Sequence, residues 1–260
     1  MTNTTACGGQ TPRNTPQGDE FHLCDTTLRG AYSAKDRLVV AKRLDDLGVG
    51  FIEGGRAPEA TEFFRRAGSG ELELRHAALI TYATLDDDPR TVLDSGAPVI
   101  TLAADSRDKD VNAIADTVRV LTAEGRRVFL AAEHFFDGYG QDPKTALRVL
   151  GAGVEAGADV AVLCDTSGGQ LPGWLGEIVA EVLYRTGYRL GVRCHDTTGC
   201  AVANTVTAVQ AGATHVQCGP GVADLATVVA NLVSKLDLPV LPKPESRHAD
   251  NREVIIVGAW

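Results

Sequence analysis

Short apolar runs alternate with helical patterns along most of this chain. Within the helical stretches apolar residues recur three and four positions apart, as in the segment from Leu38 to Leu44. Eight apolar runs stand at near-regular intervals, and they are Phe21–Cys24, Gly50–Glu53, Ala77–Thr81, Val99–Leu102, Val128–Ala132, Val160–Cys164, Leu190–His195 and His215–Cys218. This rhythm is typical of βα units whose strands form a parallel sheet.

Glycines mark the ends of the intervening helices. Ser33 is placed to cap the first helix, and Gly48 follows that helix. Gly125, Gly157 and Gly187 follow later helical stretches in the same way. Eight evenly spaced units without a long insertion favour an α/β fold, a single closed (β/α)8 TIM barrel. The alternative is an open, doubly wound sheet.

The ends of the chain lie outside this rhythm. Residues 1–19 are polar and lack periodicity, so we predict a flexible N-terminal tail before a barrel at residues 20–238. Residues 239–260 form a C-terminal extension. Its apolar run Val254–Trp260 is too short for a core of its own, and we expect it to cover the barrel or to contact another subunit.

The charge balance excludes some classes of protein. There are 25 Lys and Arg against 34 Asp and Glu, a net charge of −9, which argues against binding to nucleic acid or to a membrane surface. We find no apolar stretch long enough to span a membrane and no signal peptide. Six cysteines without a signal predict a cytoplasmic protein with reduced thiols. Four strand-end cysteines are predicted to point outward, toward the helices: Cys24, Cys164, Cys194 and Cys218.

Charged residues gather where the predicted strands end, which is where a barrel holds its active site. They are Asp25, Arg29, Glu53, Glu133, His134, Asp165, Arg193, His195 and Asp196. Their convergence at one rim predicts a site for a small anionic ligand. Taken alone, Asp165 and Thr166 would equally well cap the turn at Gly168-Gly169.

Five segments resemble motifs of the isopropylmalate, citramalate and homocitrate synthases, the DRE-TIM metallolyase superfamily. They are Cys24–Arg29, Phe51–Gly55, Glu133–Tyr139, Leu163–Gly169 and His195–Asn204. The third and fourth are most similar to the citramalate synthase branch. The resemblance implies a TIM barrel of the pyruvate carboxyltransferase/HMGL-like type. It also implies a divalent metal that binds a 2-oxo acid and stabilises an enolate while a carbon–carbon bond is made or broken.

The sequence departs from this family at the implied metal site. Gly30 stands where the family has an aspartate, Arg193 where it has the first histidine of HxH, and Asp196 where it has an asparagine. Gly219–Gly221 replaces the NGxGER segment, and the regions that follow the barrel in the synthases are missing. Of the expected protein ligands only His195 remains. Residues 193 and 195 share a strand face, so a guanidinium would lie beside the metal position and repel a cation.

Roles are assigned through this resemblance. The predicted catalytic residues are Arg29, Glu53, His195 and Asp196, and the predicted substrate-binding residues are Arg29, Arg193, Glu133, Asp165 and Thr166. No metal-ligand set is assigned; His195 and Asp25 are the candidates if Mg, Mn or Zn binds. An acyl-CoA co-substrate remains an open prediction, because the regions that help to handle it in the synthases are absent.

Three interpretations remain open. In the first, Arg29 and Arg193 replace the charge of the metal, grip a 2-oxo acid or dicarboxylate and stabilise an enolate. His195, with Asp196 or Asp165 nearby, is then the general acid/base. In the second, an enzyme holds a relocated metal through Asp25 or Asp196 with His195. In the third, the barrel is non-catalytic and serves as the partner subunit of a complete synthase. A homo-oligomer or a hetero-oligomer with a related synthase is the expected assembly.

Overall fold

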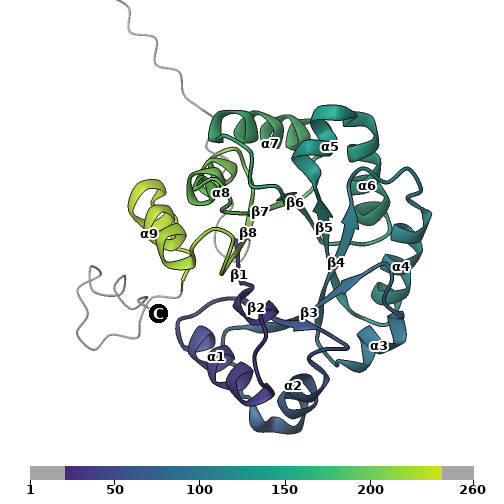
Figure 1. Cartoon of the computed structure of the whole chain (residues 1–260), viewed down its shortest axis with the longest axis vertical. Coiled ribbons are helices and arrows are strands. Elements are labelled where there is room, and N and C mark those ends of the chain that lie inside the picture. Colours follow the sequence, from purple (N-terminus) through teal and green to yellow (C-terminus); the bar gives the residue numbers. More distant parts are fainter. Residues whose placement is uncertain (1–20, 242–260) are drawn as a thin grey trace, which may run out of the picture.

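The computed structural model describes residues 21–241, and its strands close into a barrel (Figure 1). All neighbouring strands are parallel, and β1 pairs with β8 to complete the ring. The strands are β1 His22–Asp25, β2 Phe51–Arg56, β3 Ala78–Thr84, β4 Val99–Asp105, β5 Arg127–Glu133, β6 Val160–Asp165, β7 Leu190–Cys194 and β8 His215–Cys218. The predicted (β/α)8 TIM barrel is confirmed, and the open sheet is wrong.

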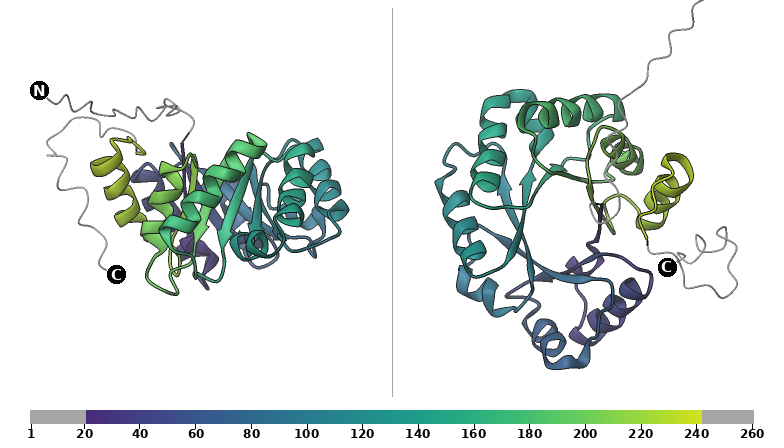
Figure 2. Two further views of the ribbon diagram at one scale, coloured as in Figure 1. Left: turned by 90° about the horizontal axis from the view of Figure 1, so that it is seen from above. Right: turned by 180° about the vertical axis from the view of Figure 1, so that it is seen from behind.

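The helices lie outside the ring of strands, as the views along the barrel axis show (Figures 1 and 2). They are α1 Ala34–Asp46, α2 Thr61–Arg66, α3 Pro89–Asp94, α4 Asn112–Ala123, α5 Phe135–Gln141, α6 Pro143–Glu155, α7 Pro172–Thr186, α8 Ala201–Gln210 and α9 Leu225–Leu236. A 3-10 turn, η1 Thr27–Arg29, follows β1, and a π-helical turn, η2 Ala67–Glu71, follows α2. The segment Glu133–Tyr139 therefore runs from the end of β5 into α5.

The predicted helix caps are present where the pattern was clearest. The Ser33 hydroxyl accepts a hydrogen bond from the backbone N–H of Asp36 and begins α1. Gly187 ends α7 with a φ of +66°, a conformation that glycine adopts without strain. Helices α2 and α5 are not among the elements predicted from the sequence. In α5, Phe135, Phe136 and Tyr139 are all buried, so this short helix lacks the polar face that reveals a longer surface helix.

Two of the four strand-end cysteines contradict the prediction that they point outward. Cys194 and Cys218 pack in the layer between strands and helices, but Cys24 and Cys164 lie in the barrel interior with Phe51 and Phe129. The prediction assumed that the polar neighbour of each cysteine points inward. At the ends of β1 and β6 that neighbour is an aspartate whose carboxylate accepts backbone N–H groups of the following turn. Alternation then turns the thiols inward.

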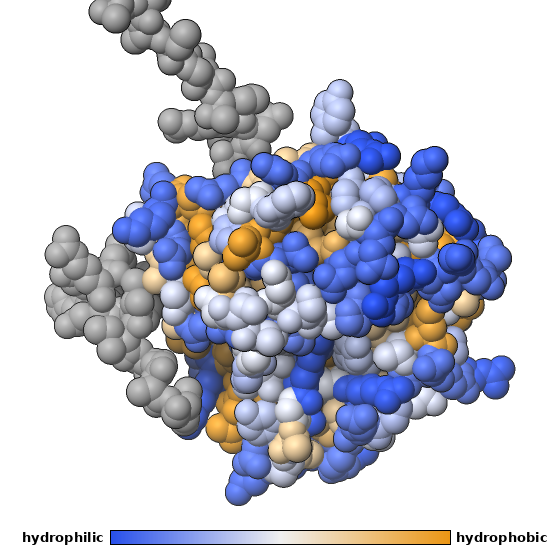
Figure 3. Space-filling model, turned by 45° about the horizontal axis from the view of Figure 1, so that its top comes forward, coloured by the Kyte–Doolittle hydropathy of each residue, from blue (hydrophilic) through white to orange (hydrophobic). Residues whose placement is uncertain are grey.

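The surface of the described part is mostly hydrophilic in the view of Figure 3, with hydrophobic residues in small separate patches. Within residues 21–241 no helix is long and apolar enough to cross a membrane. The predicted N-terminal tail and the run Val254–Trp260 lie outside the described residues. The domain boundaries at residues 19/20 and 238/239 stay predictions.

Candidate active site

The charged residues at the C-terminal ends of the strands meet in the mouth of the barrel. Glu53 lies two residues beyond Phe51, and Glu133 lies four beyond Phe129, so both follow interior-facing residues and point inward. Arg193 enters from β7, and Arg29 reaches over from η1. Separate strands thus bring two carboxylates and two guanidiniums into one site.

Two arginine–glutamate ion pairs organise this mouth. Arg29 binds Glu53 through two hydrogen bonds, of which Nη2 to Oε2 measures 3.0 Å. Arg193 donates from Nη2 to Glu133 Oε1. The Thr166 hydroxyl donates to the second oxygen of Glu133 at 2.7 Å and accepts the backbone N–H of His134 at 2.8 Å. Thr166 therefore fixes Glu133 rather than standing free for a ligand.

The two arginines differ in their access to solvent. The side chain of Arg29 is 27% exposed, and its guanidinium stacks over the ring of Tyr82 at 4.4 Å. Arg193 is only 2% exposed, and its Nε and Nη1 atoms have no hydrogen-bond partner among the described residues. A ligand in the mouth would meet Arg29 first, with Arg193 behind it.

The electrostatics of the mouth favour ionised glutamate and neutral histidine. Burial alone would raise the pKa of Glu133, but the charge of Arg193 and the hydrogen bonds from Arg193 and Thr166 hold that pKa below its usual value. Burial, reinforced by the charge of Arg193, lowers the pKa of His195 below 6.5. Neutral imidazole is therefore the dominant form of His195 at pH 7, and this form can accept a proton.

Three predicted aspartates are occupied by the backbone. Asp25 is buried and accepts the N–H of Thr27 at 2.9 Å. Asp165 is also buried and accepts the N–H groups of Gly169 and Gln170, which is the turn-capping alternative. Asp196 is exposed, and its carboxylate accepts the N–H of Ala201 at the start of α8. These contacts hold the loops around the mouth.

The donor set at the family's metal position does not fit a divalent ion. Gly30 has no side chain to offer, and Arg193 places a buried cation where a neutral imidazole would be needed. In the described range 21–241, no three His, Cys, Asp or Glu side chains come together in a way that could hold a metal. His195 alone would bind such an ion weakly, because several fixed ligands must replace its water shell.

Sequence reasoning missed two parts of the interior. Tyr82 on β3 lies under the guanidinium of Arg29. It stands two residues beyond Ile80, which faces the barrel interior, so strand alternation could have predicted that Tyr82 also points inward. Gln217 on β8 is fully buried, and neither of its amide atoms has a partner among the described residues. Val192 on β7 pairs with Val216 on β8 in parallel register, so the next residues, Arg193 and Gln217, lie alongside each other.

A family model described as HMGL-like matches residues 20–236. The chain belongs to the HMGL-like family. This result confirms the resemblance on which the residue roles were based. It also fits the observed geometry, in which Arg29 and Glu53 of the family motifs meet as an ion pair at the C-terminal mouth.

Several curated relatives of this HMGL-like barrel are named citramalate synthases, and others are named homocitrate synthase and 2-isopropylmalate synthase. The (R)-citramalate synthase of Streptomyces coelicolor is 47% identical over 268 residues, which cover 88% of this chain and 50% of that protein. The (R)-citramalate synthase of Aquifex aeolicus is 33% identical and is also covered to 50%, with 86% of this chain aligned. The chain thus spans about half the length of the curated relatives it matches.

A solved structure shares the fold at low sequence identity. The HMG-CoA lyase of Bacillus subtilis superposes with a TM-score of 0.70 and 15% identity, covering 86% of this chain and 89% of that one. At this identity the likeness establishes the barrel architecture and nothing about substrate. The chemistry of this HMGL-like chain has to be argued from its own residues.

Proposed function

We propose that this HMGL-like barrel makes or breaks a carbon–carbon bond next to the carbonyl of a 2-oxo acid or related dicarboxylate. The reaction passes through an enolate, and guanidinium groups supply the positive charge. The observation that carries this proposal is the side-by-side arrangement of accessible Arg29, buried Arg193 and neutral His195 in one mouth. The names of the citramalate synthase relatives support the reaction class.

Arg29 is the group that contacts the substrate. Glu53 occupies its Nε and Nη2 atoms, and Nη1 has no partner among the described residues. Glu53 and Tyr82 hold the guanidinium in place, so little side-chain freedom is lost when an anion binds. Arg29 therefore binds the carboxylate of the 2-oxo acid and faces the oxygen on which the enolate charge develops.

His195 moves the proton. Its neutral imidazole takes a proton from the carbon next to the carbonyl, and the electron pair of that C–H bond becomes the enolate. In bond formation the enolate carbon then attacks the thioester carbonyl of an acyl-CoA, the C–S bond breaks, and the leaving CoA thiolate takes the proton from His195. In bond cleavage neutral His195 takes the proton of the substrate hydroxyl, the C–C bond breaks to give a carbonyl product and the enolate, and His195 returns that proton to the enolate carbon. Neither direction needs the carboxylate of Asp196, which caps α8.

The proposal is tested without knowing the acyl donor. Proton NMR in D2O would follow exchange of the C3 protons of pyruvate and 2-oxobutyrate, with excess EDTA present. We expect the protein to accelerate exchange, and Arg29→Met and His195→Gln each to abolish the acceleration. Arg119→Met is the matched control, because Arg119 forms an exposed ion pair with Asp116 on α4. Exchange that requires added metal, or that the control loses equally, would refute the proposal.

The non-catalytic alternative also has a specific observation in its favour. Both guanidiniums of the mouth are already neutralised, one by Glu53 and the other by Glu133. In this alternative the barrel serves as the partner subunit of a complete synthase. It predicts a folded protein with no exchange activity that co-elutes with a citramalate synthase on size-exclusion chromatography. Exchange activity of the isolated barrel would exclude it.

A further inference from the structure

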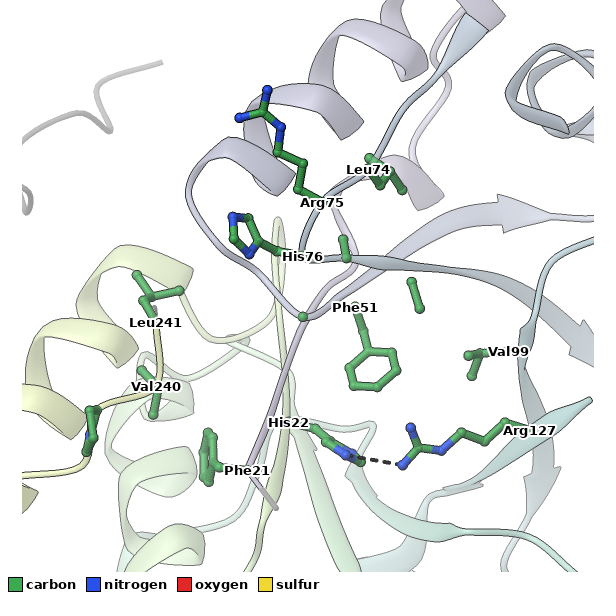
Figure 4. Close-up of a pocket in the computed structure, with 14 residues that line it drawn as sticks. Phe21, His22, Phe51, Leu74, Arg75, His76, Val99, Arg127, Val240 and Leu241 are labelled. Atoms are coloured by element: carbon green, nitrogen blue, oxygen red, sulfur yellow. Dashed lines mark hydrogen bonds between the residues drawn. The ribbon is translucent and has the colours of Figure 1, made fainter. Parts of the chain in front are cut away.

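A cavity of about 650 Å3 opens at the end of the barrel opposite the candidate active site (Figure 4). It lies where β1 to β5 begin, and its lining includes the apolar residues Phe21, Phe51 and Leu74. This volume is in the range of ligand sites in proteins. The mechanism proposed above does not use this end of the barrel, so the cavity needs a separate explanation.

The charged groups that line this cavity are all basic. Arg75, His76 and Arg127 contribute to the walls, and the lining contains no Asp or Glu. This is unusual in a chain with a net charge of −9. An occupant that brings both carboxylates and apolar side chains would match these walls, because the aromatic and aliphatic surface needs cover and the cations need counter-charge.

Neutral His22 contacts two guanidiniums at the base of the cavity. Its Nε2 atom lies 3.2 Å from Arg127 Nη2 and 2.9 Å from Arg189 Nη2, and a guanidinium can only donate. Nε2 is therefore the acceptor, and burial together with the two arginines lowers the pKa of His22 to about 3. Asp159 pairs with Arg127 through a 2.7 Å hydrogen bond and lies 4.0 Å from Arg189.

The chain itself leaves the described structure at the edge of this cavity. Pro239, Val240 and Leu241 form part of its lining (Figure 4). In the sequence the apolar run Val254–Trp260 follows; residues 242–253 before it carry three Lys or Arg and three Asp or Glu, and Glu253 is the one directly beside the run. The residues between Leu241 and Val254 can span about 40 Å at ~3.5 Å per residue, so the run can return to the cavity.

We propose that Val254–Trp260 of this same chain docks in the cavity at the N-terminal mouth. Its aliphatic side chains cover Phe21, Phe51 and Leu74, and Glu253 supplies counter-charge to the basic wall. A tether of this length gives an effective local concentration of about a millimolar, so a free ligand or a second copy competes poorly.

Tryptophan fluorescence of the full chain tests this proposal. Trp174 is 69% exposed on α7, and Trp174→Phe leaves Trp260 as the single reporter. In that background we expect acrylamide to quench Trp260 several-fold less than free indole. Leu74→Asp should raise the quenching to the value of a solvent-exposed tryptophan. Leu171→Asp is the matched control, because Leu171 is 59% exposed before α7 and far in the fold from the cavity, and it should leave Trp260 shielded.

Two further measurements keep the proposal open to refutation. Ile255→Asp changes only the docking run, so it should expose Trp260 even if Leu74→Asp fails to fold. Shielding must also persist on dilution, because docking is intramolecular. Trp260 quenched like free indole in the parent protein would overturn the proposal. Shielding that disappears on dilution would overturn it as well, and would point to a second copy as the occupant.

Discussion

Asp25 provides a quantitative test of the electrostatics at the end of β1. This aspartate is 2% exposed, and burial raises the pKa of its carboxyl from 3.8 to about 6. The folded protein therefore holds this proton more tightly than the unfolded chain does. The resulting stabilisation is fully present below about pH 4 and is lost as the pH rises through 6. A shift of about two units corresponds to about 3 kcal/mol.

Asp25→Asn removes the charge and keeps an oxygen that can accept the N–H of Thr27. We expect the variant to gain about 3 kcal/mol in free energy of unfolding, relative to the parent, between pH 4 and pH 7. Urea unfolding followed by circular dichroism across this range would measure the difference. A difference in free energy of unfolding between variant and parent that does not change with pH would refute the reasoning. The expected difference arises only when Asp25 of the parent becomes charged in its buried position.

Asp45 is a control of opposite sign. It is fully buried, and although burial alone would raise its pKa, hydrogen bonds from the backbone N–H groups of Arg75, His76 and Ala77 lower that pKa to about 2. The ionised carboxylate of Asp45 therefore stabilises the folded protein above pH 3.8, and this stabilisation is lost as the pH falls through 2. Asp45→Asn should therefore be less stable than the parent at pH 7, with a gap that narrows in acid. If Asp25→Asn shows this same trend, the assignment at Asp25 is wrong.

Three further substitutions test the barrel mouth. Glu133→Gln leaves the buried charge of Arg193 without its carboxylate and should cost about 3–5 kcal/mol in urea unfolding, whereas a small cost would mean that Arg193 finds another partner. Gly30→Asp combined with Arg193→His should create Mn²⁺ binding detectable by EPR titration, which the parent lacks; tight Mn²⁺ binding by the parent would contradict the donor-set argument. Gln217→Met should destabilise by about 1–3 kcal/mol, because we expect a buried water to bond the amide of Gln217, which has no partner among the described residues; equal or higher stability would indicate a dry interior.

The fold could be predicted because its signal is periodic. Each strand is a short apolar run and each long helix has one apolar face, so the order and number of βα units are visible in the sequence. The short helices α2 and α5 were missed, since six or seven residues do not establish a period. Closure into a ring followed from the even spacing of the units.

The site could be predicted only as a collection of residues. Position at a strand end brought Arg29, Glu53, Glu133 and Arg193 to one rim, but it could not show which arginine pairs with which glutamate. It also could not separate a carboxylate that faces the mouth from one that caps a turn, as Asp165 does. That difference depends on whether the last residue of the strand points inward or outward, and the regular alternation of side chains breaks down there. For the same reason the directions of Cys24 and Cys164 were predicted wrongly.

If the proposed enolate chemistry is correct, the charges in the mouth predict how the rate of proton exchange depends on pH. Two guanidiniums and two glutamates cancel, so a 2-oxo acid adds one negative charge and its enolate would add a second. The second charge is tolerable only if the proton stays on His195 as an imidazolium beside the enolate. Proton exchange should then increase with pH as free His195 loses its proton, and burial and the charge of Arg193 place that pKa below 6.5. The rate of exchange measured from pH 5 to 8.5 should therefore rise on the acid side and be flat above neutrality. An acid limb centred above 6.5 would show that the base is some group other than His195.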